Sequence, residues 1–171
     1  SEGRVNEMHI GLKGTMNALF LKDLAAKTRR GLSGRIQKGK SAGGKAYGYD
    51  VVRELGEDGE LKRGDLAINS DQAAVVRRIF QAYVDGMSPG KIADMPRGPA
   101  WDKSTIHGNP KRGTGILNNE LYIGRRVWNR QEFVKDPQTG KRQARPNSDA
   151  AVEYSDVPDL RIIPQGLWEA V

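Results

Sequence analysis

The chain has 171 residues and a formal net charge of +7, and hydrophobic residues make up 37% of the sequence. This length and composition allow one ordinary domain with a small appendage. The absence of cysteine excludes disulfides and thiolate metal sites. Because the two histidines, His9 and His107, lie far apart, we expect no metal and no cofactor. No run approaches the roughly 20 apolar residues that span a bilayer, so we expect a cytoplasmic protein.

The charge is segregated along the chain. Residues 27–45 contain seven basic and no acidic residues, and Glu120 is the only acid between Lys103 and Arg130. Residues 50–71, in contrast, carry seven acids against three bases. Separated basic stretches are typical of surfaces that meet a polyanion, and DNA or RNA is the obvious candidate. The alternative is a solvated basic face that has no partner.

The first helical signal lies between about residues 13 and 39. Its apolar residues recur at spacings of three, four and eight, which keeps them largely on one side of a helix. These residues are Met16, Leu19, Phe20, Leu24, Leu32 and Ile36. The second half is too basic and too rich in glycine to belong to a core, so we expect the helix to leave one body and lie on another. The alternative is a surface helix with a frayed end.

Residues 39–49 contain closely spaced glycines and indicate an extended connector. Lysines on a glycine-rich backbone can follow a phosphate chain or enter a minor groove. A nucleotide-binding phosphate loop is excluded because the chain contains no GxxxxGK[ST] pattern. A plain flexible linker remains the alternative.

A short hairpin and a core helix follow the connector. We expect a strand over residues 47–54, a turn at 56–59 and a returning strand over 65–69. Ser70 opens a helix that ends at Gly86. Its predicted buried side consists of Ala74, Val75, Ile79, Phe80 and Tyr83.

Two short helices come next, and the proline-containing residues 96–99 interrupt the helical pattern between them. Ser88 is the predicted N-cap of the first, with Pro89 in the first helical position, and Asp102 is the predicted N-cap of the second. This layout resembles a helix-turn-helix, in which the second helix reads DNA. The alternative is generic packing of two short helices.

The C-terminal third alternates between strands and turns. Residues 122–128 have a strand pattern, as does the stretch around Arg142, and residues 136–140 form a turn between them, so we expect a small hairpin. We interpret Tyr122 and Trp128 as packing residues rather than base-stacking platforms. A last helix begins at Pro164.

The sequence lacks the residue sets that nucleophilic or acid–base catalysis requires. Neither histidine has an evident carboxylate partner, and no pair of carboxylates lies in an apolar context that would raise a pKa. Serines such as Ser33 and Ser41 lie in basic stretches that would not position a nucleophile. The residues therefore favour binding over catalysis.

Several segments, in this order and at this spacing, resemble the large serine recombinases of the resolvase, invertase and integrase type. They are FLKDLAAKTRRG (20–31), GKSAGG (39–44), YGY (47–49), WDKSTI (101–106), GTGILNN (113–119), YIGRRVWNR (122–130), DPQTGKR (136–142), PDLRII (158–163) and LW (167–168). Members of this family integrate phages and transfer mobile elements, which implies a bacterial or phage protein.

The resemblance implies an α+β, mainly helical fold: a long N-terminal helix followed by a compact helix-turn-helix-like domain with small β-hairpins. Residues 1–40 would be the exit helix of a catalytic domain, and residues 41–171 the recombinase DNA-binding domain. In this family a serine of the catalytic domain attacks a DNA phosphate, and a tetramer exchanges strands. We expect no cleavage by this chain alone, double-stranded DNA as its partner, and self-association in the full-length protein.

The resemblance also implies the residues that contact DNA at an attachment half-site. In the family the exit helix carries a Glu-Arg-Thr phrase, and Lys27 occupies the position of its arginine, keeping the charge without the bidentate fork. The connector would cross the minor groove, and the helix after Asp102 would face the major groove. The expected set is Lys27, Arg35, Lys38, Lys40, Gly43, Gly44, Lys45, Lys103, Ser104, Thr105, His107, Arg112, Arg125, Arg126 and Arg130.

Two other functions stay open on the sequence. The apolar stripe between Met16 and Ile36 could pair helices between subunits, which predicts a protein-interaction module. A structure-selective RNA binder is the second, although the sequence lacks the aromatic platforms that such proteins use.

Overall fold

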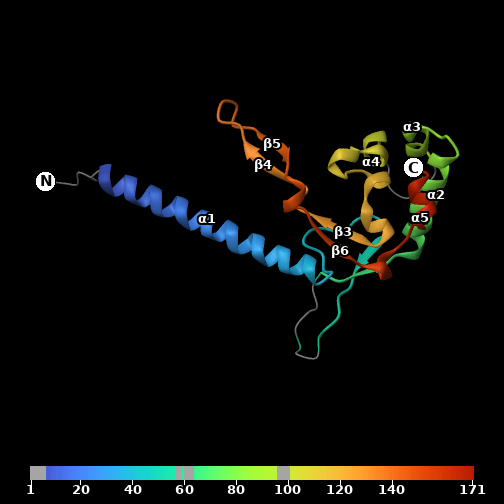
Figure 1. Cartoon of the computed structure of the whole chain (residues 1–171), viewed down its shortest axis with the longest axis horizontal. Helices are drawn as coiled ribbons and strands as arrows, with labels where there is room; N and C mark the ends of the chain where they lie inside the picture. Colours follow the sequence, from blue (N-terminus) through green and yellow to red (C-terminus); the bar gives the residue numbers. More distant parts are fainter. Residues whose placement is uncertain (1–6, 57–58, 60–63, 96–100) are drawn as a thin grey trace. The chain divides into compact units, whose positions relative to one another are not determined.

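The computed structural model of the chain describes residues 7–56, 59, 64–95 and 101–171. The chain divides into two compact units, residues 1–34 and residues 35–171. Helix α1 (Glu7–Gln37) makes up the described part of the first unit, and its last three residues belong to the second (Figure 1). Two predicted features lie at least partly outside the described residues. They are the interruption between helices at residues 96–99 and the two central residues of the predicted 56–59 turn. The first and last residues of that turn are joined by a hydrogen bond from the Gly59 amide to the Gly56 carbonyl (3.0 Å).

The fold is α+β, as predicted. The elements of the second unit follow one another as short helices, 3₁₀ turns and short strands. Its helices are α2 (Ser70–Val84), α3 (Pro89–Ala93), α4 (Lys103–His107) and α5 (Gln165–Glu169). Its strands are β1 (Tyr49–Val51), β2 (Leu66–Ile68), β3 (Arg125–Trp128), β4 (Gln131–Lys135), β5 (Arg142–Pro146) and β6 (Glu153–Asp156). Its 3₁₀ turns are η1 (Pro110–Arg112), η2 (Ile116–Asn118), η3 (Glu120–Ile123), η4 (Asp149–Ala151) and η5 (Pro158–Leu160).

The strands form three separate antiparallel pairs. The β1–β2 pair lies within the two predicted strands, 47–54 and 65–69, and it places Tyr49 opposite Ile68. The hairpin expected around the 136–140 turn is present, but its first strand is β4 and not residues 122–128. Residues 122–128 instead comprise the end of η3 followed by β3, and β3 pairs with the distant strand β6. Local alternation indicated the strands, but not which of them form hydrogen bonds to each other.

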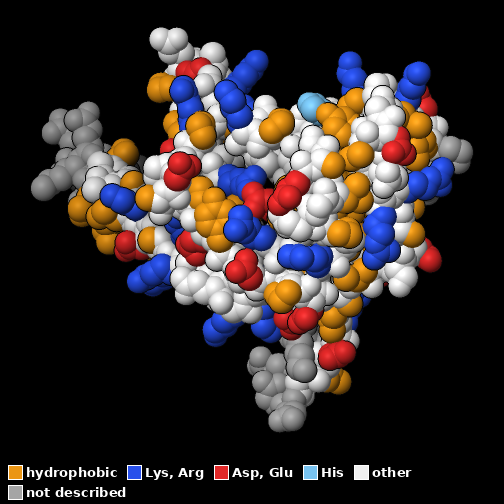
Figure 2. All heavy atoms as spheres, turned by 45° about the vertical axis from the view of Figure 1, so that its right-hand side comes forward, with side chains coloured by type: hydrophobic (Ala, Val, Ile, Leu, Met, Phe, Trp, Pro, Cys, Tyr) orange, Lys and Arg blue, Asp and Glu red, His pale blue; other side chains and the backbone are white. Residues whose placement is uncertain are grey.

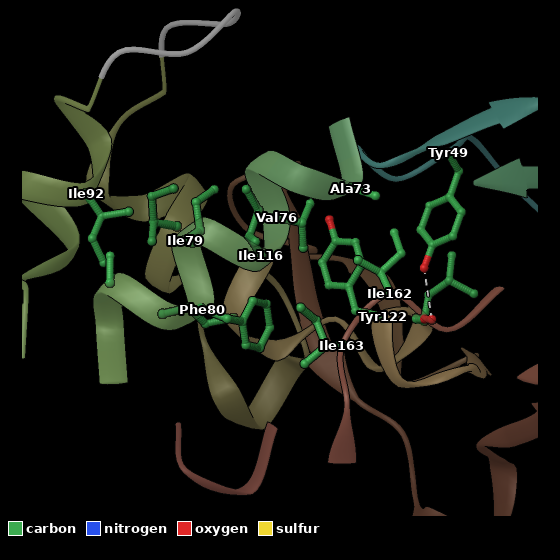
Figure 3. Close-up of a cluster of buried hydrophobic side chains, with 14 of the residues drawn as sticks. Tyr49, Ala73, Val76, Ile79, Phe80, Ile92, Ile116, Tyr122, Ile162 and Ile163 are labelled. Carbon is green, nitrogen blue, oxygen red and sulfur yellow. Dashed lines mark hydrogen bonds between the residues drawn. The ribbon is translucent and has the colours of Figure 1, made fainter. Parts of the chain in front are cut away.

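Helix α2 supplies one wall of the hydrophobic core. Its N-cap is Asn69, whose side chain accepts a hydrogen bond from the Gln72 amide (3.0 Å). The predicted buried face is only partly right, because Ala73 and Val76 are fully buried where Ala74 is exposed. Figure 3 shows this face packed against side chains from α3, η2, η3 and the segment after η5. Ile79 and Phe80 are buried as predicted, whereas Ala73, Val76 and Ala82 are buried in place of their predicted neighbours Ala74, Val75 and Tyr83.

Tyrosines occupy the centre of the core. The Tyr49 hydroxyl donates to the Leu160 and Leu121 carbonyl oxygens (2.8 and 3.0 Å), and a dashed line marks a hydrogen bond of this hydroxyl in Figure 3. The Tyr122 hydroxyl donates to the Tyr47 carbonyl (2.9 Å). Burial raises the pKa values of both tyrosines, so the hydroxyls stay protonated donors. Tyr122 is thus a packing residue, as predicted.

The two ends of α1 have different surroundings. Helix α1 extends beyond the predicted 13–39 at its N-terminal end and stops at Gln37. Phe20 and Met16 have 66% and 61% of their surface exposed, whereas Ile36 is buried at 4%. The expectation that the second half of this helix contributes nothing to a core is therefore wrong at Ile36.

Candidate nucleic-acid interface

Helix α4 is held by a cap, one buried side chain and a glycine. Asp102 accepts hydrogen bonds from the Thr105 amide (2.9 Å) and the Ser104 hydroxyl (2.6 Å), which makes it the N-cap that the sequence predicted. These bonds, that from Ser104 first, lower the pKa of Asp102, so its carboxylate remains charged. Ile106 is fully buried, and Gly108 ends the helix with a positive φ of 56°. One face of α4 is therefore fixed to the core.

The glycine at the end of α4 allows a close backbone approach. A methyl group at Gly108 would overlap the carbonyl group of Thr114, which lies in the next turn. The Asn118 side chain donates to the His107 carbonyl and to the Thr114 carbonyl, and so joins the end of α4 to η2. The position of α4 is fixed at both ends, which a recognition element requires.

The opposite face of α4 is exposed. Lys103, Ser104 and His107 are exposed, and Thr105 is half-buried. Turn η1 follows directly and exposes Lys111 and Arg112, with the Asn109 side chain accepting from the Arg112 amide (3.2 Å). Within the described residues, the cations of Lys103, Lys111 and Arg112 form no ion pair with a carboxylate. Sequence reasoning missed Lys111, although it lies beside Arg112 in the same turn-rich phrase.

The glycine-rich connector is anchored at several points. The Arg35 side chain donates to the Ser41 carbonyl (2.9 Å), and the Ser41 amide donates to the Gly64 carbonyl (2.7 Å). The Ser41 hydroxyl in turn donates to the Gly43 carbonyl (2.8 Å) and lies 3.3 Å from that of Gly44. The connector is thus held in one conformation here, which does not agree with a plain flexible linker.

The two lysines of the connector lie beside carboxylates. Lys40 forms an ion pair with Asp65 (3.0 Å), and Lys45 with Asp50 (2.9 Å). Gly43 and Gly44 are exposed, and no atom lies within 4 Å of a methyl group placed on either of them. The backbone at these two glycines is therefore open to a ligand.

A ring contact links the connector to the start of α4. Tyr47 meets Trp101 edge to face, with ring centroids 4.6 Å apart. Because Tyr47 also receives the Tyr122 hydrogen bond through its carbonyl, the connector, α4 and the core form one continuous packed region.

Arg126 is used inside the protein. It is 7% exposed, and its Nε donates to the carbonyl of Gly39 (2.8 Å), which follows α1 closely. Desolvation lowers the pKa of Arg126. Its Nη2 has no hydrogen-bond partner within the described residues. The sequence placed Arg126 beside an exposed arginine and gave no sign that it points inward.

Its neighbours on the same strand region are also paired. Arg130 forms an ion pair with Glu120. Arg125 lies 3.4 Å from Glu120 and over the ring of Tyr154 at 5.5 Å, and half of its side chain is exposed. Glu120, the only acid in this basic stretch, therefore joins two of the expected phosphate clamps.

The expected site residues fall into four groups. Lys103, Ser104, Thr105, His107 and Arg112 come together on α4 and η1. The connector holds Lys40, Gly43, Gly44 and Lys45 at its surface, next to exposed Lys38, while Arg35, Arg125, Arg126 and Arg130 take part in internal contacts. Lys27 is exposed on α1, in the first unit. In Figure 2 the cationic side chains are spread among acidic and apolar ones rather than gathered in one block.

A family model named Recombinase matches residues 70–171, which is more than half of the chain. The chain belongs to the recombinase-domain family of the large serine recombinases. This membership gives the protein a role in site-specific DNA recombination, with DNA as a partner. Comparisons with curated proteins and with solved structures gave no match. Across the described part of the chain, no helix is both long and apolar enough to cross a membrane.

Proposed function

We propose that this recombinase domain binds duplex DNA sequence-specifically, as the reader of an attachment half-site in an integrase of a mobile element. The observation that carries the proposal is the polarity of α4: Ile106 is buried on one side, and Lys103, Ser104 and His107 are exposed on the other. Together α3 and α4 act as a helix-turn-helix, with α4 in the major groove. Hydroxyl, imidazole and ammonium groups on one exposed face match the donors and acceptors of base edges and phosphates.

The connector supplies a second contact, in the minor groove. Gly43 and Gly44 lack side chains and have open space beside their Cα atoms, so the backbone can approach the floor of a groove closely. Lys40 and Lys45 can exchange their carboxylate partners for phosphates, because both ion pairs are half-exposed and such pairs are weak.

The internal contacts of the arginines narrow the set of phosphate contacts. Arg126 and Arg35 stabilise the fold, and Arg130 orients Glu120, so we leave these three out of the proposed contacts. Lys103, Lys111 and Arg112, which form no ion pair within the described residues, take their place, and Lys38 and Lys27 remain in the proposed set. With about six phosphate contacts, the affinity falls roughly 10³-fold between 50 and 200 mM salt.

Selection from a random duplex library at about 150 mM salt tests the proposal. The expected result is one enriched, asymmetric motif about one helical turn long. Retention of DNA without enrichment would contradict sequence-specific binding by this chain, and a folded protein that retains no DNA would contradict DNA binding altogether.

Variants then locate the contact surface. Lys103→Ala and Arg112→Ala are each expected to weaken binding of the selected duplex and to reduce the salt slope by about one unit. Arg78→Ala, which removes an exposed arginine from α2, is the matched control and leaves both quantities unchanged. Equal losses in all three variants would mean that binding follows net charge only.

We propose self-association through α1 as a second function. Leu12, Met16, Leu19 and Phe20 lie on one side of this helix and each have more than half of their surface exposed, and a stripe of this kind is stabilised by a second helix. Phe20→Ser is expected to lower the apparent mass in sedimentation equilibrium, while Lys103→Ala leaves it unchanged. Loss of both association and DNA binding in Phe20→Ser would show that the two functions are not separate.

A further inference from the structure

The β4–β5 ribbon is exposed on both of its faces. Gln131 and Ala144 are half-buried, and the other eight strand residues are exposed, among them Phe133 at 60% and Val134 at 44%. A two-stranded ribbon that buries neither face gains little stability from packing. In Figure 1 it extends away from the β3–β6 ribbon. Its apolar side chains are therefore available to a partner.

Side-chain hydrogen bonds fix the ribbon at its base and at its tip. At the base, the Asn147 side chain donates to the carbonyl (2.7 Å) and side-chain oxygen (2.9 Å) of Asn129, a residue with a positive φ of 64°. At the tip, Asp136 accepts from the Gln138 amide (2.9 Å) and the Gln143 side chain (3.1 Å). The ribbon is thus preorganised without being packed, which lowers the entropy cost of binding.

The strand register separates the charges between the two faces. Phe133 lies opposite Ala144, and Lys135 lies opposite Arg142, so these four side chains share one face. This surface, which we call the Phe133 face, also includes Gln131 and Pro146 and contains no acid. On the other face, Glu132 lies opposite Arg145.

We propose that the Phe133 face of the β4–β5 ribbon is a second DNA-reading element, which lies in the major groove separately from α4. The proposal rests on the proposed function, because it takes duplex DNA as the ligand. A two-stranded ribbon fits the width of the major groove. Lys135 and Arg142 contact phosphates or guanine edges, and Phe133 contacts a thymine methyl group. A protein partner is less suited to this face, since lysine is depleted from the cores of protein interfaces.

The test compares two pairs of cations in the full chain. Lys135→Ala/Arg142→Ala removes both charges of the Phe133 face, and Lys141→Ala/Arg145→Ala removes two exposed charges elsewhere on the same ribbon. Binding to the selected duplex is measured by fluorescence anisotropy between 50 and 200 mM salt. The first variant is expected to bind about ten-fold more weakly, with a salt slope shallower by about two units. The second variant is expected to behave as the unaltered chain.

Repeating the selection with Phe133→Ser tests readout of a base. The expected result is the loss of one thymine preference from the enriched motif. A motif that keeps every preference would overturn the role of Phe133.

The outcomes separate this proposal from the proposed function. If Lys103→Ala weakens binding but Lys135→Ala/Arg142→Ala does not, the ribbon proposal fails and the proposed function stands. Equal losses in the two double variants overturn the assignment to the Phe133 face. If Phe133→Ser changes self-association and leaves DNA binding unaltered, the ribbon is a protein interface instead. Failure of the unaltered chain to bind any duplex overturns both proposals.

Discussion

Two antiparallel ribbons of similar size lie in the second unit, and they differ in what holds them. The β3–β6 ribbon carries the buried Arg126 and is bonded to the core at its ends. The β4–β5 ribbon is exposed on both faces and depends on hydrogen bonds at its base and tip. Both ribbons contain basic residues, but Arg126 of the β3–β6 ribbon is buried, whereas Arg142 of the β4–β5 ribbon is exposed. A basic residue therefore stabilises the fold in the first ribbon and is available to a ligand in the second.

The anchored ribbon begins and ends beside tyrosines of the core. The Tyr49 hydroxyl contacts the carbonyl of Leu121, shortly before β3, and that of Leu160, shortly after β6. The Tyr122 carbonyl accepts hydrogen bonds from the Ile162 and Ile163 amides (both 2.8 Å). Buried backbone groups are therefore satisfied where the ribbon enters the core.

The largest difference in stability is expected between arginines of the two ribbons. Arg126→Ala removes a buried charged donor from the Gly39 carbonyl and should lower the free energy of unfolding by about 2 kcal/mol. Arg142→Ala removes an exposed side chain and should change it by less than about 0.5 kcal/mol. Urea denaturation followed by circular dichroism measures both. Equal values would contradict the difference drawn between the ribbons.

A smaller effect is expected at the anchor itself. Tyr49→Phe keeps the ring and removes the hydroxyl from two buried carbonyls, which should cost about 1 kcal/mol of unfolding free energy. Tyr154→Phe is the matched control, because this tyrosine of β6 is 54% exposed, and its stability should stay within about 0.5 kcal/mol of the original. An unchanged midpoint for Tyr49→Phe would mean that water satisfies the carbonyls.

The exposed ribbon should respond to acid at its tip. Hydrogen bonds to Asp136, that from the Gln138 amide first, lower its pKa below the ordinary 3.8. The carboxylate therefore stabilises the turn at pH values above 3.8, and this contribution is lost as the pH falls through the lowered pKa. The amide resonances of Gln138 and Thr139 should shift in an NMR titration with a midpoint below 3.8. A midpoint at or above that value would contradict the turn geometry.

The connector combines properties of both ribbons, because it is held by hydrogen bonds yet exposed. Gly43→Ala and Gly44→Ala meet no atom within 4 Å, so their unfolding midpoints should stay unchanged. If the backbone enters a groove, each should weaken DNA binding by about three- to ten-fold, which corresponds to roughly 1 kcal/mol. Gly166→Ala on α5, where space is also open, is the control and should bind normally. Normal binding by all three would exclude a close approach at the connector.

Short-range signals in the sequence were sufficient for the helix starts. Ser88 and Asp102 cap α3 and α4 as predicted, because a cap depends on the three residues that follow it. The β1–β2 pair and the turn of the β4–β5 ribbon were predicted for the same reason. The α4 residues of the candidate site follow from the cap, since it fixes which of them face the core.

Contacts between distant residues could not be predicted. Lys40 pairs with Asp65, 25 positions later, and β3 pairs with β6 across the β4–β5 ribbon. Arg125 and Arg126 are neighbours with the same charge, and only the pairing of β3 decides which one points inward. The face of α2 was misjudged because residues 73–74 are both alanine and residues 75–76 both valine, so apolar spacing alone does not decide which member of each pair is buried. Because several basic residues pair with carboxylates or are buried, the net charge of the sequence overstated the number of cations available to DNA.

The hydrogen bond from Tyr49 to the Leu160 carbonyl spans 111 positions of the chain, and it affects the order of folding. During synthesis, the core cannot close until the segment through Ile163 has left the ribosome, since that segment completes the wall around Tyr49. Contacts of such long range also slow folding, because the entropy cost of closing the loop comes before any gain from packing. Tyr49 precedes residue 70, where the family match begins, so a chain cut at that point would lack part of its own hydrophobic core.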